Sequence, residues 1–420
     1  MNRHLLIIYP HWPPSNLAGM HRARLVANGA RGAGWDVTVI TVDAAHYEEP
    51  HDEEMCQLVR SGVEVIHTRA RPVLRLFGKR LIGDIGIRGY RHIKATATKW
   101  LSNNRTDFIW IPIPSWYTSL MGPSLSRTFN TPYGIDYIDP WVYQLTHHEP
   151  FMSRAWWTRQ VALILEPKAI RSASIISGVA EEYFTPAIHR NFNSETKPNT
   201  VAFPYGFDPD DHHKEPEQPT FPFDPKTSKY ILYAGAFLPH SESFARQLFS
   251  ALEELVSEGI WPDDLYFHFV GTGRRPGPSI ESIAAEHGLG QVIQEHPDRI
   301  PFLSIQSLLR QAEGSLVLGS TEAHYTASKT FQCLLANRPL FSILHKDSSA
   351  LALIAECQAD HYSVRWHAST PDITHMIKAC LSAFIAGNHK SWQPDLAPLE
   401  RHSTTSGTLK LLRAIESLKA

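Results

Sequence analysis

The feature of this sequence that most limits the fold is a series of short apolar runs, each followed by a loop and then by a helical pattern. Residues 4–9, 36–42 and 108–113 form such runs in the first half, and residues 230–234, 265–270 and 315–318 form them in the second half. Continuous apolar runs of this length are typical of parallel strands that helices cover on both faces. The sequence therefore predicts an α/β protein with parallel sheets.

A change of composition near the middle divides the chain. The 420 residues exceed what one typical core holds, and residues 208–229 contain five prolines and two adjacent histidines, as a linker would. We therefore predict an N-terminal domain at 1–207, a linker at 208–229 and a second domain at 230–400. A C-terminal amphipathic helix at 401–420 follows, and one arrangement packs it back on the N-terminal domain.

Composition excludes several classes of protein. The net charge of -2 gives no global sign of nucleic-acid binding. The 4 cysteines have no paired or metal-like spacing, which indicates reduced thiols in a cytosol and predicts no metal site. The first apolar run is too short for a secretory signal, and no window approaches the length of a membrane span. We expect a cytoplasmic protein whose membrane contact, if it has any, is peripheral.

The segment 69–101 is strongly biased toward one charge. It contains nine lysines and arginines against a single acid, Asp84, with leucines and isoleucines interleaved. Two interpretations stay open: docking on the anionic inner face of a membrane, or a solvated helical face whose charges only aid solubility. RNA binding is a weaker third, because no nucleic-acid module accompanies the charges. In the first interpretation the membrane-facing residues are Arg75, Lys79, Arg80, Arg88 and Arg91.

Two carboxylates, Asp136 and Asp139, lie at the end of the run 133–139, which is a predicted parallel strand. Catalytic groups usually sit at that end, so either carboxylate can act as a general base or orient a substrate hydroxyl. Their alternative role is to cap the following turn. The helix predicted next, at 153–171, is expected to turn Trp157, Val161, Ile164 and Leu165 inward.

A phosphate site is predicted in the second half. Ser328 and Lys329 fall in the first turn of a short helix, at 328–336, that follows the strand 315–318. Free N–H groups and a cation at a helix start favour a phosphate or pyrophosphate group. Glycines after two other strands, Gly235, Gly271 and Gly273, allow close backbone approach. The alternative is a capped helix with a solvated lysine.

Several stretches resemble one family. YPHWPPSNLAGMHRARLVANGARGAGWDVTVIT is similar to the opening of the retaining, metal-independent family-four glycosyltransferases. YGIDYIDPW resembles their active-site strand, and YILYAGAF, FHFVGTG and ASKTFQCLLANRPLF resemble their donor-domain signatures. The resemblance implies the GT-B fold, which has two tandem Rossmann-like domains with an interdomain cleft. It also implies transfer of a sugar from a nucleotide diphosphate sugar to a hydroxyl acceptor, without a cofactor.

The resemblance also implies residue roles. The second domain would bind the donor and the first would shape the acceptor site, with Asp139 and Asp136 near the reacting sugar. If the basic segment docks to a membrane, the acceptor is a lipid-linked glycan, and the enzyme acts in polysaccharide or glycolipid assembly. The donor-binding residues would be Gly19, Gly235, Arg246, Gly271, Gly273, Glu322, His324, Ser328, Lys329 and Gln332.

The sequence departs from the family at two places. The paired glutamates of the family fall on His324 and Gln332, with Glu322 two residues from the first, and Arg246 alone lies near the usual basic pair. A GT-B protein that binds a sugar nucleotide or a partner without catalysis, and a sugar-nucleotide epimerase, are therefore the alternative functions. None of the three functions involves nucleic acid.

Overall fold

The structure is a computed structural model that describes residues 3–76, 79–143, 151–193, 195–274, 277–321, 329–387 and 392–418, with the backbone only at 76 and 79–82. The chain forms two compact units. Unit 1 comprises Met1–Asp208 and His402–Ala420, and unit 2 comprises Pro209–Arg401.

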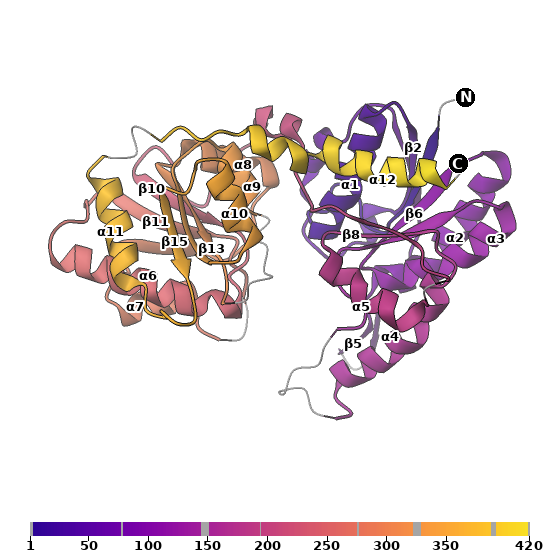
Figure 1. Cartoon of the computed structure of the whole chain (residues 1–420), viewed down its shortest axis with the longest axis horizontal. Helices are drawn as coiled ribbons and strands as arrows, with labels where there is room; N and C mark the ends of the chain where they lie inside the picture. The colour runs from indigo at the N-terminus through magenta and orange to yellow at the C-terminus, as the bar shows by residue number, and fades with distance from the viewer. Residues whose placement is uncertain are drawn as a thin grey trace. The chain divides into compact units, whose positions relative to one another are not determined.

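Unit 1 is built on a parallel sheet in which β1 lies between β2 and β6 (Figure 1). Leu6 of β1 lies opposite Thr38 of β2 on one side and Ile109 of β6 on the other. Among the described residues the strand order is β3 (Val63–Thr68), β2 (Asp36–Val42), β1 (His4–Ile8), β6 (Phe108–Ile113), β7 (Tyr133–Tyr137), β8 (Ile175–Gly178) and β9 (Asn199–Ala202).

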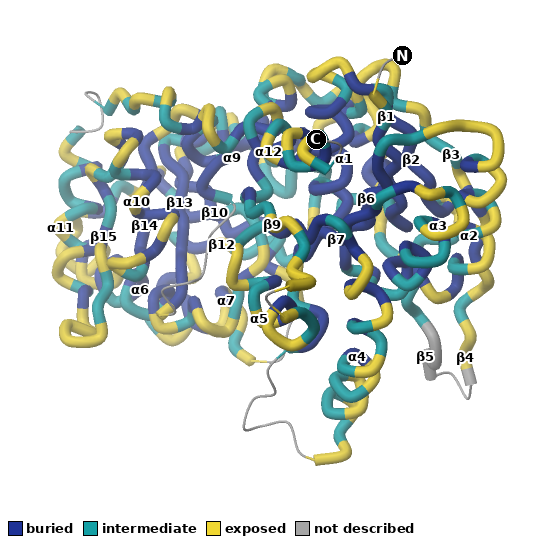
Figure 2. Tube along the Cα trace, turned by 45° about the vertical axis from the view of Figure 1, so that its right-hand side comes forward, coloured by how far each residue is buried: buried dark blue, intermediate teal, exposed yellow. Residues whose placement is uncertain are grey.

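Helices cover both faces of this sheet, which is why the central strands β1, β6 and β7 are almost entirely buried, whereas the edge strands β3 and β9 are partly exposed (Figure 2). On one face α1 (Ala18–Gly32) packs beside the C-terminal helix α12 (Thr404–Ser417), drawn in indigo and yellow in Figure 1. The opposite face carries α2 (Ile85–Asn103), α3 (Gly122–Phe129), α4 (Arg154–Ile170) and α5 (Glu181–Asn191). Short 3-10 turns complete the unit: η1 (Ala44–His46), η2 (Glu53–Leu58), η3 (Trp116–Met121) and part of η7 (Ala397–His402).

Unit 2 repeats the plan with a second parallel sheet. Its described strands run in the order β12 (Ile293–His296), β11 (Leu265–Val270), β10 (Lys229–Ala234), β13 (Gly314–Leu318), β14 (Leu340–His345) and β15 (Tyr362–Trp366). One face carries α6 (Glu242–Ser257), α7 (Ile280–Glu286) and α11 (Thr374–Ile385). The other carries α8 (Phe302–Gln311), α9 (Lys329–Leu335) and α10 (Ser349–Glu356), and the turns are η4 (Pro209–His213) and η5 (Pro239–Ser241).

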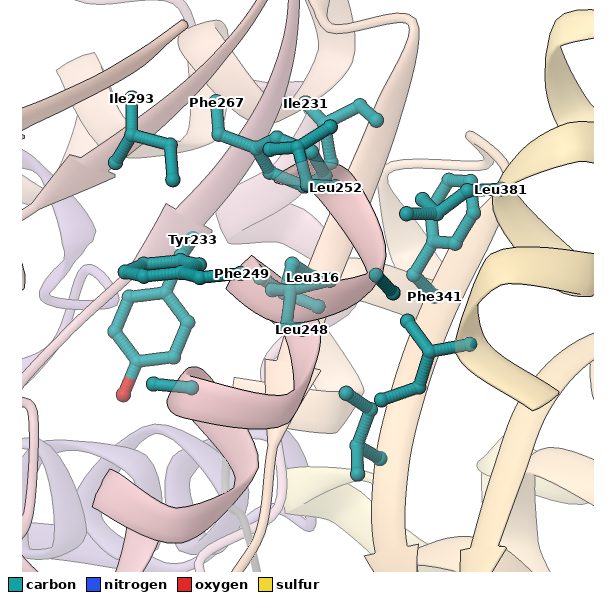
Figure 3. Close-up of a cluster of buried hydrophobic side chains, with 14 of the residues drawn as sticks. Ile231, Tyr233, Leu248, Phe249, Leu252, Phe267, Ile293, Leu316, Phe341 and Leu381 are labelled. Carbon is teal, nitrogen blue, oxygen red and sulfur yellow. The ribbon is translucent and has the colours of Figure 1, made fainter. Parts of the chain in front are cut away.

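The core of unit 2 shows how the strand alternation sets these layers. Ile231 and Tyr233 of β10 face α6, where Leu248, Phe249 and Leu252 pack on them (Figure 3). The alternate residue Tyr230 faces the other layer and donates its hydroxyl to a carbonyl oxygen of α8, at 2.8 Å. The prediction of two tandem parallel α/β domains is confirmed.

The segment expected as an interdomain linker, residues 208–229, packs on unit 2. The amide of Thr220 donates to the Ser304 hydroxyl at 3.0 Å, and the Phe223 ring stacks on His268 with centroids 3.6 Å apart. Residues 209–229 belong to unit 2 for this reason. Proline-rich composition indicates only that a segment has no regular structure, whereas the aromatic residues within such a segment can still pack on a sheet.

The basic segment forms a hairpin and a helix. A two-stranded antiparallel hairpin, β4 (Leu74–Leu76) and β5 (Lys79–Ile82), precedes α2. Arg75 and Arg91 are exposed, and the side chains of Lys79 and Arg80 lie outside the described residues. Arg88 corrects the expectation of a membrane-facing residue: it is 6 % exposed and donates to the carbonyl oxygens of Arg71 and His46. None of the helices that the structure describes has both the length and the apolar character needed to cross a bilayer.

The expected inward face of α4 is wrong at three of its four residues, whereas the fourth, Leu165, is partly buried and packs on the core of unit 1. Trp157, Val161 and Ile164 are exposed, and the helix buries Ala162, Glu166 and Ala169 against unit 1. The small side chains of Ala162 and Ala169 let α4 pack closely against its neighbours. Glu166 can be buried on the same face because it pairs with Arg190. Apolar spacing identified one face of the helix, but it could not show which face meets the protein.

Candidate functional site

The strand order of each sheet indicates where on its carboxyl edge a ligand would bind. In unit 2 the chain goes from β10 to β11 and β12, then returns to pair β13 on the other side of β10. Loops that follow two such strands diverge, and open α/β sheets bind ligands in the space left there. The residues at this point are Gly235, directly after β10, and Lys329, which begins α9 after β13.

Lys329 has the most unusual environment of these residues. Its Nζ atom is buried and has no hydrogen-bond partner among the described residues. It lies 3.7 Å from the centroid of the Tyr233 ring, and a Cβ at Gly235 would stand 3.5 Å from it. Burial lowers the pKa of Lys329 to about 7. An amine desolvated in this way gains most from an anion that binds beside it.

The glycines after the strands provide space. Gly235, Gly271 and Gly273 have positive φ angles of 120°, 74° and 78°, a region that residues with a Cβ seldom adopt. Each already donates its N–H to a backbone carbonyl, those of Val270, His296 and Pro297. Their contribution at a ligand is therefore close approach of the backbone rather than free N–H groups.

A hollow of about 220 Å³ adjoins these glycines in unit 2. Phe237, Gly273, Arg274 and Pro297 line it, together with Glu295 at the end of β12. The Glu295 carboxylate accepts from the Thr272 hydroxyl at 2.5 Å and from the amide of Glu281 at 2.9 Å, so it is held in place. The sequence offered no specific signal for this hollow, because its residues come from four separate segments.

Two other predicted donor residues are engaged elsewhere. Arg246, predicted as a donor-binding cation, pairs with Glu242 at 3.1 Å and with Glu286 on α7 at 2.5 Å. Gln332 accepts a hydrogen bond from Gln306 at 2.8 Å. Glu322, His324 and Ser328 lie outside the described residues.

In unit 1 the corresponding edge contains Asp139, two residues after β7. Asp139 is exposed, yet the protein atoms around its carboxyl still desolvate it and raise its pKa. Burial also raises the pKa of Tyr9, Tyr183 and Tyr205, and the negative charge of Asp139 adds to each shift. Three phenols from three separate segments thus lie within electrostatic range of one carboxylate, and phenols and carboxylates are groups that can hydrogen-bond a polyhydroxylated ligand.

Gly19 makes room within this group. It is the second residue of α1, and a Cβ there would stand 1.9 Å from the Tyr9 hydroxyl oxygen. Any side chain at this position would displace Tyr9, so a glycine is what lets the Tyr9 hydroxyl approach the start of α1.

Asp136 lies on β7 but is fully buried. Its two oxygens accept from Nε and NH2 of Arg22, both at 2.9 Å, and Ser177 donates to it at 2.6 Å. The remaining guanidinium donor of Arg22 binds the carbonyl oxygens of Phe203 and Pro204 at 2.8 Å. This corrects the catalytic expectation for Asp136: it cannot reach a substrate, and it ties α1 and the turn after β9 to the sheet.

Sequence reasoning missed Arg22, Tyr9 and Tyr205. A signal for Arg22 was present, because it precedes Leu25 and Val26 by three and four residues and so falls on the buried stripe of α1. A charge there requires a buried partner of opposite sign, and Asp136 lies inside an apolar strand. Tyr9 and Tyr205 had no such signal, since aromatic residues at strand ends usually belong to the core.

No family model matches the sequence, and no curated protein sequence matches it either. Solved structures do match. Anabaena HepE in complex with UDP and glucose has a TM-score of 0.60 at 14 % identity, over 99 % of this chain and 100 % of that one. The fold is shared. This chain has the GT-B fold.

Two further structures support that assignment. The N-terminal domain of Candida albicans trehalose-6-phosphate phosphatase has a TM-score of 0.61 at 15 % identity, over 100 % of this chain and 97 % of that domain. Sucrose-phosphate synthase from Thermosynechococcus elongatus has a TM-score of 0.56 at 14 % identity, over 100 % and 98 % of the two chains. At this identity the likeness shows the fold, and the activity is argued below from the residues of the chain itself.

Proposed function

We propose that this GT-B protein is a glycosyltransferase, in which unit 2 binds a nucleotide diphosphate sugar and unit 1 supplies the acceptor-side carboxylate, Asp139. The observation that supports this most is Lys329. A buried amine, unpaired among the described residues and beside a glycine that leaves room for a ligand, is suited to the diphosphate of a donor. Positive charge beside the leaving diphosphate stabilises the charge that develops as the glycosidic bond breaks.

The adjoining hollow is the proposed place of the nucleoside. Its aromatic wall, Phe237, and its glycine backbone at Gly273 suit the face of a base, and Glu295 can accept from a hydroxyl or amide donor. Because HepE forms complexes with UDP and with UDP-glucose, uracil is the first base to test. The acceptor is a sugar hydroxyl, and a lipid-linked glycan of polysaccharide or glycolipid assembly at the inner membrane face is the acceptor we propose.

Binding of UDP is expected to depend on Lys329 and on pH. Below about pH 7 the amine is charged in the empty site, and above it the site must take up a proton to pair with the diphosphate. Affinity should therefore fall as pH rises from about 7 to 9, by up to about tenfold per unit. Calorimetry in buffers of different ionisation enthalpy should record the proton uptake.

The matched variants are Lys329→Met and Lys346→Met. The first removes the buried amine and should weaken UDP binding by about 1–3 kcal/mol while abolishing its pH dependence above 7. The second removes an exposed lysine that pairs with Asp347 at 2.8 Å, and it should change neither. Equal binding by wild type and Lys329→Met would place the diphosphate elsewhere.

Transfer assays separate the three candidate activities. A glycosyltransferase forms product only when an acceptor is present, whereas an epimerase changes the sugar nucleotide alone. A binding protein without catalysis, which Gln332 in place of a glutamate favours, would bind the donor and leave it intact. Retention would appear as an unchanged anomeric configuration, and metal independence as unchanged transfer after EDTA.

A further inference from the structure

A row of large apolar side chains lies exposed on the surface of unit 1. Trp157, Val161 and Ile164 occupy one face of α4 at spacings of four and three residues, and they are 51 %, 40 % and 60 % exposed. Phe151 and Met152, just before the helix, are 75 % and 59 % exposed. Five such side chains lie within fourteen residues of sequence, a higher density than the scattered exposure of single apolar residues on an ordinary surface. We call these five residues the α4 apolar row.

The charges around the α4 apolar row have one sign. Arg154, Lys168 and Arg171 are exposed on the same helical segment. The one acid of the helix, Glu166, is buried and accepts from Arg190 and from Asn191, at 2.8 and 3.0 Å. Among the described residues, the exposed charged side chains of α4 and its C-cap are therefore all cations, and they stand beside the apolar side chains.

The hairpin adds a further apolar and basic segment to unit 1. In Figure 1, β5 lies on the same side of unit 1 as α4. Leu74 of β4 is 55 % exposed, and the neighbouring Arg75 has only Glu48, at 3.7 Å, as an ion-pair partner among the described residues. The turn η3 contacts both α2 and α4, and beside it Arg71 and Arg91 line a hollow with Tyr90 and Tyr117.

We propose that the α4 apolar row docks unit 1 on an anionic membrane, with its five side chains in the headgroup region and the flanking cations on lipid phosphates. Tryptophan favours this region because its ring is apolar and its N–H is polar. Cations beside an apolar helix face are the pattern of helices that lie in a membrane surface. A twofold contact between two copies would instead bring these cations together, which is unfavourable.

This docking does not depend on the proposed transfer reaction, since it needs neither donor nor acceptor. It also assigns the main membrane contact to α4 and not to the basic segment 69–101. The sequence predicted membrane contact from Arg75, Lys79, Arg80, Arg88 and Arg91. Of these, Arg88 is buried, and the side chains of Lys79 and Arg80 lie outside the described residues. The lipid-facing apolar area comes from α4, whose exposed side chains the sequence pattern had placed inward.

Vesicle sedimentation of the full chain tests the proposal without any sugar nucleotide. Wild type should bind vesicles of phosphatidylcholine with about one third phosphatidylglycerol, bind pure phosphatidylcholine weakly, and lose binding as salt is raised. The double variant Trp157→Ser with Ile164→Ser should bind the anionic vesicles at least about tenfold more weakly, because two large apolar side chains no longer enter the headgroups.

The matched control is Val256→Ser with Ile260→Ser, which removes two apolar side chains of similar exposure, 39 % and 45 %, from unit 2. It should bind as wild type does. All these positions are exposed, so the thermal midpoints of both variants should equal that of wild type, which shows that folding is not the cause. Failure of wild type to bind, equal loss in both variants, or a wild-type dimer that the α4 variant dissociates would each overturn the proposal.

Discussion

Replacement of Asp139 by asparagine is expected to lower the transfer rate by about 10²–10⁴-fold while the protein stays folded. Asparagine keeps the size of the side chain but can neither take a proton from an acceptor hydroxyl nor carry negative charge. Because Asp139 is exposed, the exchange should not disturb the sheet. Donor binding should change little, since Lys329 and the glycine loops belong to the other unit.

The pH profile gives an independent measurement of the role of Asp139. A carboxylate acts as a base only when deprotonated, so activity should rise with pH through its pKa. Desolvation raises that pKa above the ordinary value for aspartate, and the acidic limb should therefore lie at higher pH than usual. The limb should be absent from the residual activity of Asp139→Asn.

Asp43 supplies the control for that experiment. It follows β2 at the same edge of the same sheet, is exposed, and accepts from the amide of Ala45 at 2.9 Å. Asp43→Asn removes an equal charge from that edge, so it should keep the transfer rate within about twofold, as surface substitutions usually do. A rate loss of similar size in both variants would indicate a general electrostatic effect and would remove the catalytic role of Asp139.

The fold could be predicted from the sequence because its signal is repeated along the whole chain. Each strand of a doubly covered sheet must be apolar on both faces, and a run such as Phe108–Ile113 is compatible with few structures besides a buried strand. The orientation of an amphipathic helix has no such redundancy. The spacing of apolar residues in α4 is compatible with an apolar face that packs on the protein and equally with one that faces outward. The orientation of the helix is decided by the elements that pack beside it.

The places of the candidate residues could be predicted in part. Lys329, Gly235 and Asp139 were predicted as site residues because they follow strands of α/β sheets, and the structure places Gly235 after β10, Asp139 after β7 and Lys329 at the start of α9. The separate roles of Asp136 and Asp139 could not be told from sequence, although they lie three residues apart. Strand alternation and the turn after β7 bury one and expose the other, and the burial of Asp136 depends on Arg22, which is more than a hundred residues away.

Replacement of Arg22 by methionine is expected to lower the free energy of unfolding by about 3–5 kcal/mol. Methionine fills much of the volume but leaves the Asp136 carboxylate buried with only Ser177 to donate to it, and it leaves the carbonyl oxygens of Phe203 and Pro204 without their donor. Urea unfolding at pH 7, followed by circular dichroism, measures the change.

Two further variants identify the cause of that loss. Arg22→Met combined with Asp136→Leu removes both charges, so it should recover part of the stability lost by Arg22→Met alone. Arg31→Met removes an arginine from the same helix whose pair with Asp36, at 2.8 Å, is partly solvated, and it should cost less than about 1 kcal/mol. If the double variant is no more stable than Arg22→Met, the loss comes from the carbonyl contacts and packing of Arg22. If it recovers, the cause is the charge of Asp136, which Arg22→Met leaves buried without its partner, and the role of Arg22 is to compensate that charge.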